Sequence, residues 1–144
     1  MIIFDLSLEI AAPRADVFAW WSDPHNIPKW QSGVVRVDFE GEAGKGARYT
    51  VVRKALGMTQ EMRTTIIDFV DGERLVEKAR GGPATNSITT TFTDAGGGRT
   101  RMDSHVEIDL GGVLGRLGDK LAAGKLKSQA KSDQQRLKKV LESL

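Results

Sequence analysis

The chain of 144 residues contains no cysteine and only two histidines. Without cysteine it can form neither a disulfide bond nor a thiolate metal site. His25 and His105 lie far apart in unlike contexts, and no carboxylates stand beside them at the spacing of metal ligands. We therefore expect no metal site and no other cofactor.

Long apolar runs are also missing. No stretch approaches the roughly 18 apolar residues of a membrane-spanning helix. The first residues lack the basic start and long apolar middle of a signal peptide. We expect a cytoplasmic protein, with residues 1–144 forming a single domain that buries roughly two-thirds of its unfolded surface.

Aromatic residues are scarce, at 6% of the chain. They lie in the early and central segments and are not interleaved with the basic residues. Proteins that bind single-stranded nucleic acid combine aromatic stacking with a basic groove. Nucleic acid is therefore not an expected partner.

Positive charge is concentrated near the C-terminus. From Leu114 onward there are eight basic and three acidic residues, a balance of +5, so the remainder carries 2 − 5 = −3. This basic segment predicts either a solvated helix face or contact with an anionic surface such as a membrane.

Alternation of apolar and polar residues predicts about seven strands. They span residues 2–10, 34–40, 48–54, 59–69, 74–80, 85–93 and 100–110. Residues 14–30 contain two closely spaced prolines and predict two short helices. Residues 113–144 predict one long helix. Because short turns join the strands, the sheet should be antiparallel, and the fold class α+β with the helices on one face.

The strand phase directs hydroxyl groups as well as apolar side chains toward the long helix. Such a mixture predicts a cavity with a few polar groups in an apolar wall. The alternative is a filled core in which the hydroxyls bond to one another. The residues expected to contact a ligand are Trp30, Tyr49, Val51, Met62, Thr64, Ile66, Ile88, Thr90, Phe92, Met102, Ser104 and Leu126.

The long helix has apolar residues on two sides. One side carries Ala122, Ala123, Leu126, Ala130, Leu137, Val140, Leu141 and Leu144, and the nearly opposite side carries Leu114, Leu117 and Leu121. Either the helix bends or starts late near its glycines, so that both stripes face the sheet, or the second stripe is an exposed patch. An exposed patch would dock on a membrane or on a second copy in a homodimer. We expect the first arrangement.

Several short motifs follow one another in a characteristic order. They are Ile10-Ala11-Ala12-Pro13, Val17-Phe18, Asp23-Pro24, Pro28 with Trp30, Gly44 with Gly46, and Asp71-Gly72-Glu73-Arg74-Leu75. A glycine-rich hairpin and a long C-terminal helix come after them. Over essentially its whole length the chain resembles the START-like (SRPBCC) superfamily, which includes the polyketide cyclase/dehydrase and lipid-transport proteins.

The resemblance implies a helix-grip fold, a seven-stranded antiparallel sheet wrapped around the C-terminal helix with a deep hydrophobic cavity between them. Ligands in the superfamily include lipids, sterols, polyketides and plant hormones, and some members cyclise or dehydrate polyketides. The resemblance supplies no universal catalytic residue. Trp30 matches a tryptophan that is commonly structural.

The expected function is binding or transport of a small hydrophobic molecule, such as a lipid or polyketide, in the cavity. The alternatives are an aromatase/cyclase-type enzyme and a membrane-docking or protein-interaction module using the basic helix. For the enzyme, Arg53 would polarise the substrate, Tyr49 would donate a proton and Asp133 would pair with Arg53. Both histidines are expected in surface or turn positions.

Overall fold

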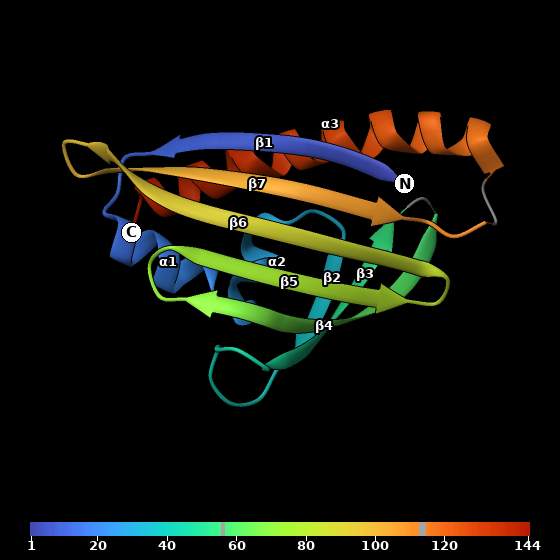
Figure 1. The fold of residues 1–144 in the computed structure, drawn as a ribbon, viewed down its shortest axis with the longest axis horizontal. Coiled ribbons are helices and arrows are strands. Elements are labelled where there is room, and N and C mark those ends of the chain that lie inside the picture. Colours follow the sequence, from blue (N-terminus) through green and yellow to red (C-terminus); the bar gives the residue numbers. More distant parts are fainter. Residues whose placement is uncertain (56, 113–114) are drawn as a thin grey trace.

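One curved antiparallel sheet and a long helix make up most of the protein (Figure 1). The computed structural model describes the whole chain except residues 56 and 113–114, and only the backbone of residues 55 and 115–119. The strands of this described part are β1 (Ile2–Ile10), β2 (Val34–Asp38), β3 (Arg48–Ala55), β4 (Met58–Val70), β5 (Arg74–Gly81), β6 (Ala84–Gly96) and β7 (Arg99–Asp109). The helices are α1 (Arg14–Trp21), the 3₁₀ turn η1 (Pro24–Asn26), α2 (Ile27–Trp30) and α3 (Gly115–Glu142).

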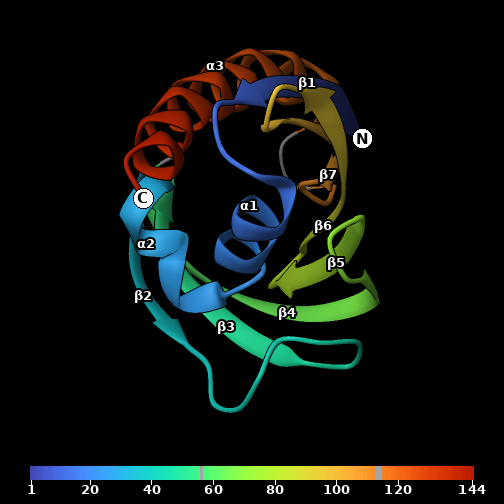
Figure 2. The ribbon, with the colours of Figure 1, turned by 90° about the vertical axis from the view of Figure 1, so that its left-hand side faces the viewer.

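The strand order is β1-β7-β6-β5-β4-β3-β2, with every neighbouring pair antiparallel. The predicted α+β, helix-grip architecture is confirmed. Figure 2 shows the sheet curling beneath α3, with α1 in the opening at one end. Helix α3 contacts β1 at one edge of the sheet and α2 beside the other edge. A single helix therefore spans the concave side of the sheet.

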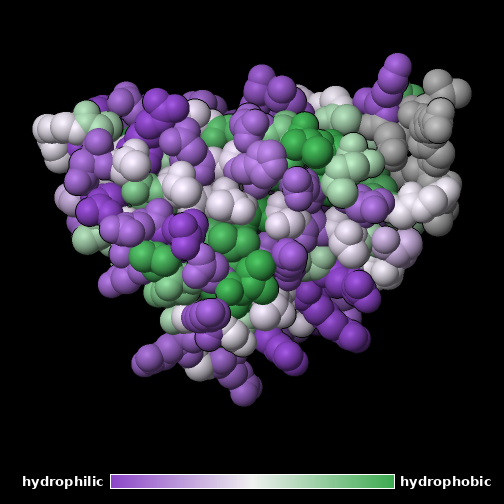
Figure 3. Space-filling view, in the orientation of Figure 1, coloured by the Kyte–Doolittle hydropathy of each residue, from purple (hydrophilic) through white to green (hydrophobic). Residues whose placement is uncertain are grey.

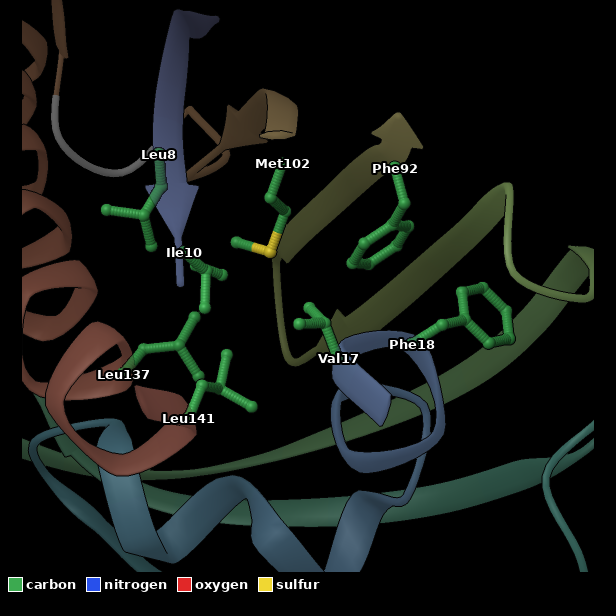
Figure 4. Packing of buried hydrophobic residues seen from close by; sticks show 8 residues of the cluster. All are labelled: Leu8, Ile10, Val17, Phe18, Phe92, Met102, Leu137 and Leu141. Carbon is green, nitrogen blue, oxygen red and sulfur yellow. The ribbon is translucent and has the colours of Figure 1, made fainter. Parts of the chain in front are cut away.

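The end of the molecule that holds α1 is tightly packed (Figure 4). The Phe18 ring meets the rings of Phe69 and Phe92 edge-on, with centroids 5.2 Å apart in both pairs. Leu137 and Leu141 of α3 join this cluster and are almost fully buried. Burying a leucine side chain stabilises a fold by about 1.5–3 kcal/mol, so these contacts fix the C-terminal half of α3.

The outward side of the sheet is mostly polar. In Figure 3 hydrophilic side chains predominate on the face seen in Figure 1, with a few hydrophobic ones among them. Ile3, which alternates with buried neighbours on β1, is one exposed exception. This contrast between the two faces agrees with the predicted alternation along the strands.

Strand β2 differs from its prediction. It ends at Asp38, two residues early, and its pairing with β3 shifts register between Val34 and Arg36. Because a bulge changes the phase of the neighbouring residues, the side chain of Val35 is exposed although it alternates with polar residues in the sequence. Val37 packs beside the buried cluster that includes residues of β3 and β4.

The two leucine stripes of α3 do not both face the sheet. Leu121 is 80% exposed, so our expectation was wrong for this residue, and Leu144 at the end of the predicted inward stripe is 69% exposed. The helix is continuous from Gly115 to Glu142, so Leu121 lies about 100° around the helix axis from the buried Ala122 and points to solvent. Leu114 and the side chain of Leu117 lie outside the described residues, as does Leu56, which we placed in a turn.

Gly33 joins α2 to the sheet at a position that excludes a side chain. Its φ is +80°, and a Cβ there would lie 2.5 Å from the carbonyl oxygen of Lys54. The same approach allows the Lys54 N–H to donate to the Gly33 carbonyl at 2.7 Å. The residue that precedes β2 is thus held against β3 by close backbone contact.

We predict that Gly33→Ala lowers the free energy of unfolding by roughly 1–3 kcal/mol from backbone strain, with a further loss from the clash. Gly41→Ala is the matched control, because Gly41 also has a positive φ, +96°, but open space around its Cβ position. Urea denaturation of both variants measures the difference. Equal losses would show that the contact with Lys54 imposes no constraint.

Candidate ligand-binding cavity

A cavity of about 150 Å³ lies between α3 and the concave side of the sheet. Its wall includes residues from β1, β3, β6, β7, α2 and α3. They are Phe4, Leu6, Trp21, Trp30, Gln31, Ser32, Arg53, Asn86, Ile88, Met102, Ser104, Val106, Ile108, Leu126, Gln129, Ala130, Asp133, Gln134 and Leu137. An engineered apolar cavity of this volume holds one benzene molecule.

One side of the cavity is mostly apolar, with Asn86 and Ser104 as its polar residues from β6 and β7. Strands β1, β6 and β7 contribute side chains such as Phe4, Ile88 and Val106, and α3 adds Leu126 and Ala130. Phe4 and Val106 are themselves buried, in a cluster that also includes Ala122 of α3. The short side chains at 122 and 130 let the helix approach the sheet without filling the space beneath its middle.

The opposite side is polar and hydrogen-bonded. The buried Asp133 carboxylate accepts the backbone N–H of Ser32 at 3.1 Å. Gln129 donates its amide to the Ser32 hydroxyl at 2.8 Å. Arg53 donates from Nη2 to Oε1 of Gln31 at 2.9 Å. These bonds connect three parts of the chain into one polar wall: strand β3, helix α3, and the segment that follows α2.

Arg53 and Asp133 are close enough to interact electrostatically but form no ion pair. Burial lowers the pKa of the Arg53 guanidinium, and electrostatic interaction with Tyr49 and then with Asp133 opposes that shift. The carboxylate of Asp133 instead has the Arg136 guanidinium 4.0 Å away. The predicted Arg53–Asp133 pairing is therefore a longer-range attraction between two groups of the same wall.

Two buried donors of the cavity wall have no hydrogen-bond partner among the described residues, Nε of Arg53 and Nε1 of Trp21. The Trp21 ring packs against Trp30, with centroids 5.0 Å apart. A buried donor without an acceptor costs about 1–3 kcal/mol. Sequence reasoning missed Trp21 as a cavity residue, although it lies four residues after the buried Val17 and therefore on the same face of α1.

A second buried polar group lies outside the cavity wall. Tyr49 donates its phenolic hydrogen to the Glu77 carboxylate and interacts with the Thr64 hydroxyl. Burial, then the negative charge of Glu77, raise the pKa of Tyr49 well above its ordinary value. Burial also raises the pKa of Glu77, and the hydrogen bond from Tyr49 opposes this shift. Glu77 was not predicted, yet it shares the inward phase of the buried residues Leu75 and Ala79.

The predicted ligand residues divide into two groups. Trp30, Ile88, Met102, Ser104 and Leu126 line the cavity, together with the two weaker candidates Arg53 and Asp133. Tyr49, Val51, Met62, Thr64, Ile66, Thr90 and Phe92 are not in its wall, and most of them pack in the buried clusters around it.

The inward hydroxyls largely follow the alternative that we considered. Thr90 and Ser104 lie within hydrogen-bonding distance of each other, at 3.4 Å. Tyr49 and Thr64 belong to the Glu77 group. Paired hydroxyls and a cavity therefore coexist, and Ser104 takes part in both.

The two histidines lie at the surface. His105 contacts the Asp5 carboxylate at 2.7 Å and Glu107 at 3.4 Å, and these hydrogen bonds, first that of Asp5, raise its pKa. His25 contacts Asp23 at 2.8 Å in the η1 turn. Within the described part of the chain, no three His, Asp or Glu side chains gather as metal ligands, and no helix there has the length and hydropathy to cross a membrane.

Residues 1–142 match the family described as polyketide cyclase / dehydrase and lipid transport. The chain belongs to this family of the START-like superfamily, whose members bind small hydrophobic molecules or have polyketide cyclase-like activity. A search of curated proteins found no match.

Solved structures share the fold over nearly the whole chain. A protein from Thermus thermophilus is 18% identical with a TM-score of 0.83, covering 98% of this chain and 97% of that one. A Chromobacterium violaceum protein is 19% identical with a TM-score of 0.77, covering 97% and 96%. A START superfamily protein from Mycobacterium smegmatis is 18% identical with a TM-score of 0.71, covering 97% and 99%. At these identities the likeness concerns the fold alone.

We predict a pH-dependent effect of Glu77→Gln on stability. The unfolded chain should release the Glu77 proton near pH 4.3, whereas the folded protein holds it to higher pH. The contribution of Glu77 to the free energy of unfolding of the wild type therefore falls as the pH rises from about 4 through the raised pKa. The variant has no proton to lose there, so its stability relative to wild type should increase with pH across that window.

Urea denaturation at a series of pH values measures this difference. Asp68→Asn is the control, because that carboxylate is on β4 and pairs with Arg74 near the surface. A Glu77→Gln difference that stays flat, or that decreases as the pH rises, would contradict the raised pKa.

Proposed function

We propose that this protein binds a small hydrophobic molecule in the cavity between α3 and the sheet. The observation that carries the proposal is the cavity itself, about 150 Å³ of space bordered by apolar side chains on one side and ordered polar groups on the other. Ligand pockets are commonly built in this way, with a few polar groups that orient a mostly apolar guest. Membership of a ligand-binding family supports the same reading.

The volume limits the size of the guest. Pockets for drug-sized molecules have about 300–1,000 Å³, and the cavity is smaller than that range. A single ring or a short acyl chain fits the space as it stands. A whole sterol or a long polyketide would require α3 to move away from the sheet, and transport of such a ligand would depend on that motion.

Binding is better supported than cyclase activity. An acid–base mechanism requires proton donors and acceptors in contact with the substrate. Arg53 and Asp133 border the cavity, but Tyr49, the proposed proton donor, is engaged with Glu77 outside its wall. The cyclase mechanism that we considered for these three residues would therefore have no proton donor in contact with the substrate.

The membrane-docking alternative has little support in the described part of α3. Leu121 is exposed, but Lys120, Gly124 and Lys125 beside it are exposed as well. Single exposed apolar residues are common on protein surfaces, and a docking surface needs a contiguous patch. The basic side of α3 agrees equally well with a solvated helix.

We predict that Ala130→Leu, which places three more carbon atoms in the cavity wall, weakens binding of ethylbenzene at least tenfold. Ser128→Leu is the control, because residue 128 lies on the exposed side of the same helix. Two-dimensional NMR titration measures both affinities, and thermal unfolding verifies that both variants fold. If ethylbenzene fails to bind the wild type, or binds both variants as it binds the wild type, the proposed cavity function is wrong.

Native mass spectrometry of gently purified protein, followed by a panel of short fatty acids and single-ring aromatics, extends this test to unknown guests. A retained small molecule that is lost from Ala130→Leu supports the proposal. Protein that arrives empty and shows no mass shift with the panel counts against it.

A further inference from the structure

The hydrogen-bonding groups of the cavity wall are unequally satisfied. Nε of Arg53 and Nε1 of Trp21 are buried donors without a partner in the described protein. The side-chain acceptors beside them are engaged, because Gln31 accepts from Arg53 and Asp133 accepts from Ser32. The wall therefore offers two unused donors, and the two acceptors named here each already receive a hydrogen bond.

We propose that the cavity selects a hydrophobic monocarboxylate, whose carboxylate receives the Arg53 and Trp21 N–H groups while its apolar body lies against β1, β6 and β7. This inference rests on the proposed function and specifies the chemical class of its ligand. A hydrogen bond from a cationic donor to a carboxylate is about twice as strong as one between neutral groups. An acid should thus bind better than a hydrocarbon of the same shape.

The charge of Arg53 is available to such a ligand. Asp133 is the carboxylate that interacts electrostatically with Arg53, but the two form no ion pair. Asp133 is held by the Ser32 N–H at 3.1 Å and lies 4.0 Å from the Arg136 guanidinium. Arg136, which does not line the cavity, therefore partly offsets the charge of Asp133. An anionic ligand at Arg53 would supply the ion-pair partner that Arg53 lacks.

A purely structural role explains Arg53 less well. A guanidinium has five N–H donors, and here Nη2 bonds to Gln31 while Nε has no acceptor. A polar residue kept only for packing would satisfy its buried donors, since more than about 90% of buried polar groups in proteins do so. Water could satisfy the same donors, but it would leave the apolar side of the cavity without a contact partner.

Three probes of similar shape test the inference by NMR titration or calorimetry: ethylbenzene, 4-ethylbenzoate and 4-ethylbenzylamine. The wild type should bind 4-ethylbenzoate at least tenfold more tightly than ethylbenzene, and 4-ethylbenzylamine more weakly than either. Arg53→Met should abolish the preference for the carboxylate, measured within that variant as the ratio of its affinities for 4-ethylbenzoate and ethylbenzene. Trp21→Phe, which removes the indole N–H, should reduce the preference several-fold.

Arg63→Met is the matched control, because Arg63 is exposed on the other face of β4 and does not line the cavity. It should keep the wild-type preference. If Arg53→Met does not fold, Trp21→Phe decides alone. Equal affinity of the wild type for ethylbenzene and 4-ethylbenzoate, or a preference that survives in both cavity variants, overturns the inference and leaves the proposed function standing. If no probe binds the wild type, both are overturned.

Discussion

Helix α3 must cover both edges of a curved sheet, and the rest of the structure depends on how it does so. Near its C-terminal end Leu137 and Leu141 are buried in the cluster around α1, and near its N-terminal end Ala122 packs against β1. Between them, Asp133 fixes the helix to the residues after α2 through the Ser32 N–H. Because α3 contacts the rest of the protein at these points and the sheet beneath it is concave, a space remains between the middle of the helix and the sheet. The cavity is that space.

The polarity of the cavity follows from the same arrangement. The strands at one edge of the sheet bring apolar side chains, whereas β3 and the α2 segment at the other edge bring Gln31, Ser32 and Arg53. Helix α3 lies over both sides of the cavity. It contributes Leu126 to the apolar side and Asp133 to the polar side. Buried polar groups are costly unless they are bonded. The hydrogen bonds from Arg53 to Gln31 and from Ser32 to Asp133 make this wall stable, and the two free donors give it selectivity.

Much of the fold could be predicted from local patterns, because strand alternation and the paired prolines are properties of short segments. The candidate site could be predicted only in part. The bulge that exposes Val35 depends on pairing with β3, which sequence alternation does not record. The separation of Tyr49 and Thr64 from the cavity depends on sheet curvature, and so does the place of Trp21 in its wall. Glu77 could have been found, since it lies in phase with Leu75, but an acidic residue was not expected inside.

Xenon binding to a pressurised crystal tests most directly whether the space under α3 accepts a guest. Xenon enters dry apolar cavities of this volume without needing a specific chemical group. The account predicts an ordered xenon atom between Leu126 of α3 and Ile88 of β6, with the positions of both elements unchanged. A crystal in which Leu126 contacts Ile88 directly, and in which no xenon lies between the helix and the sheet, would contradict it.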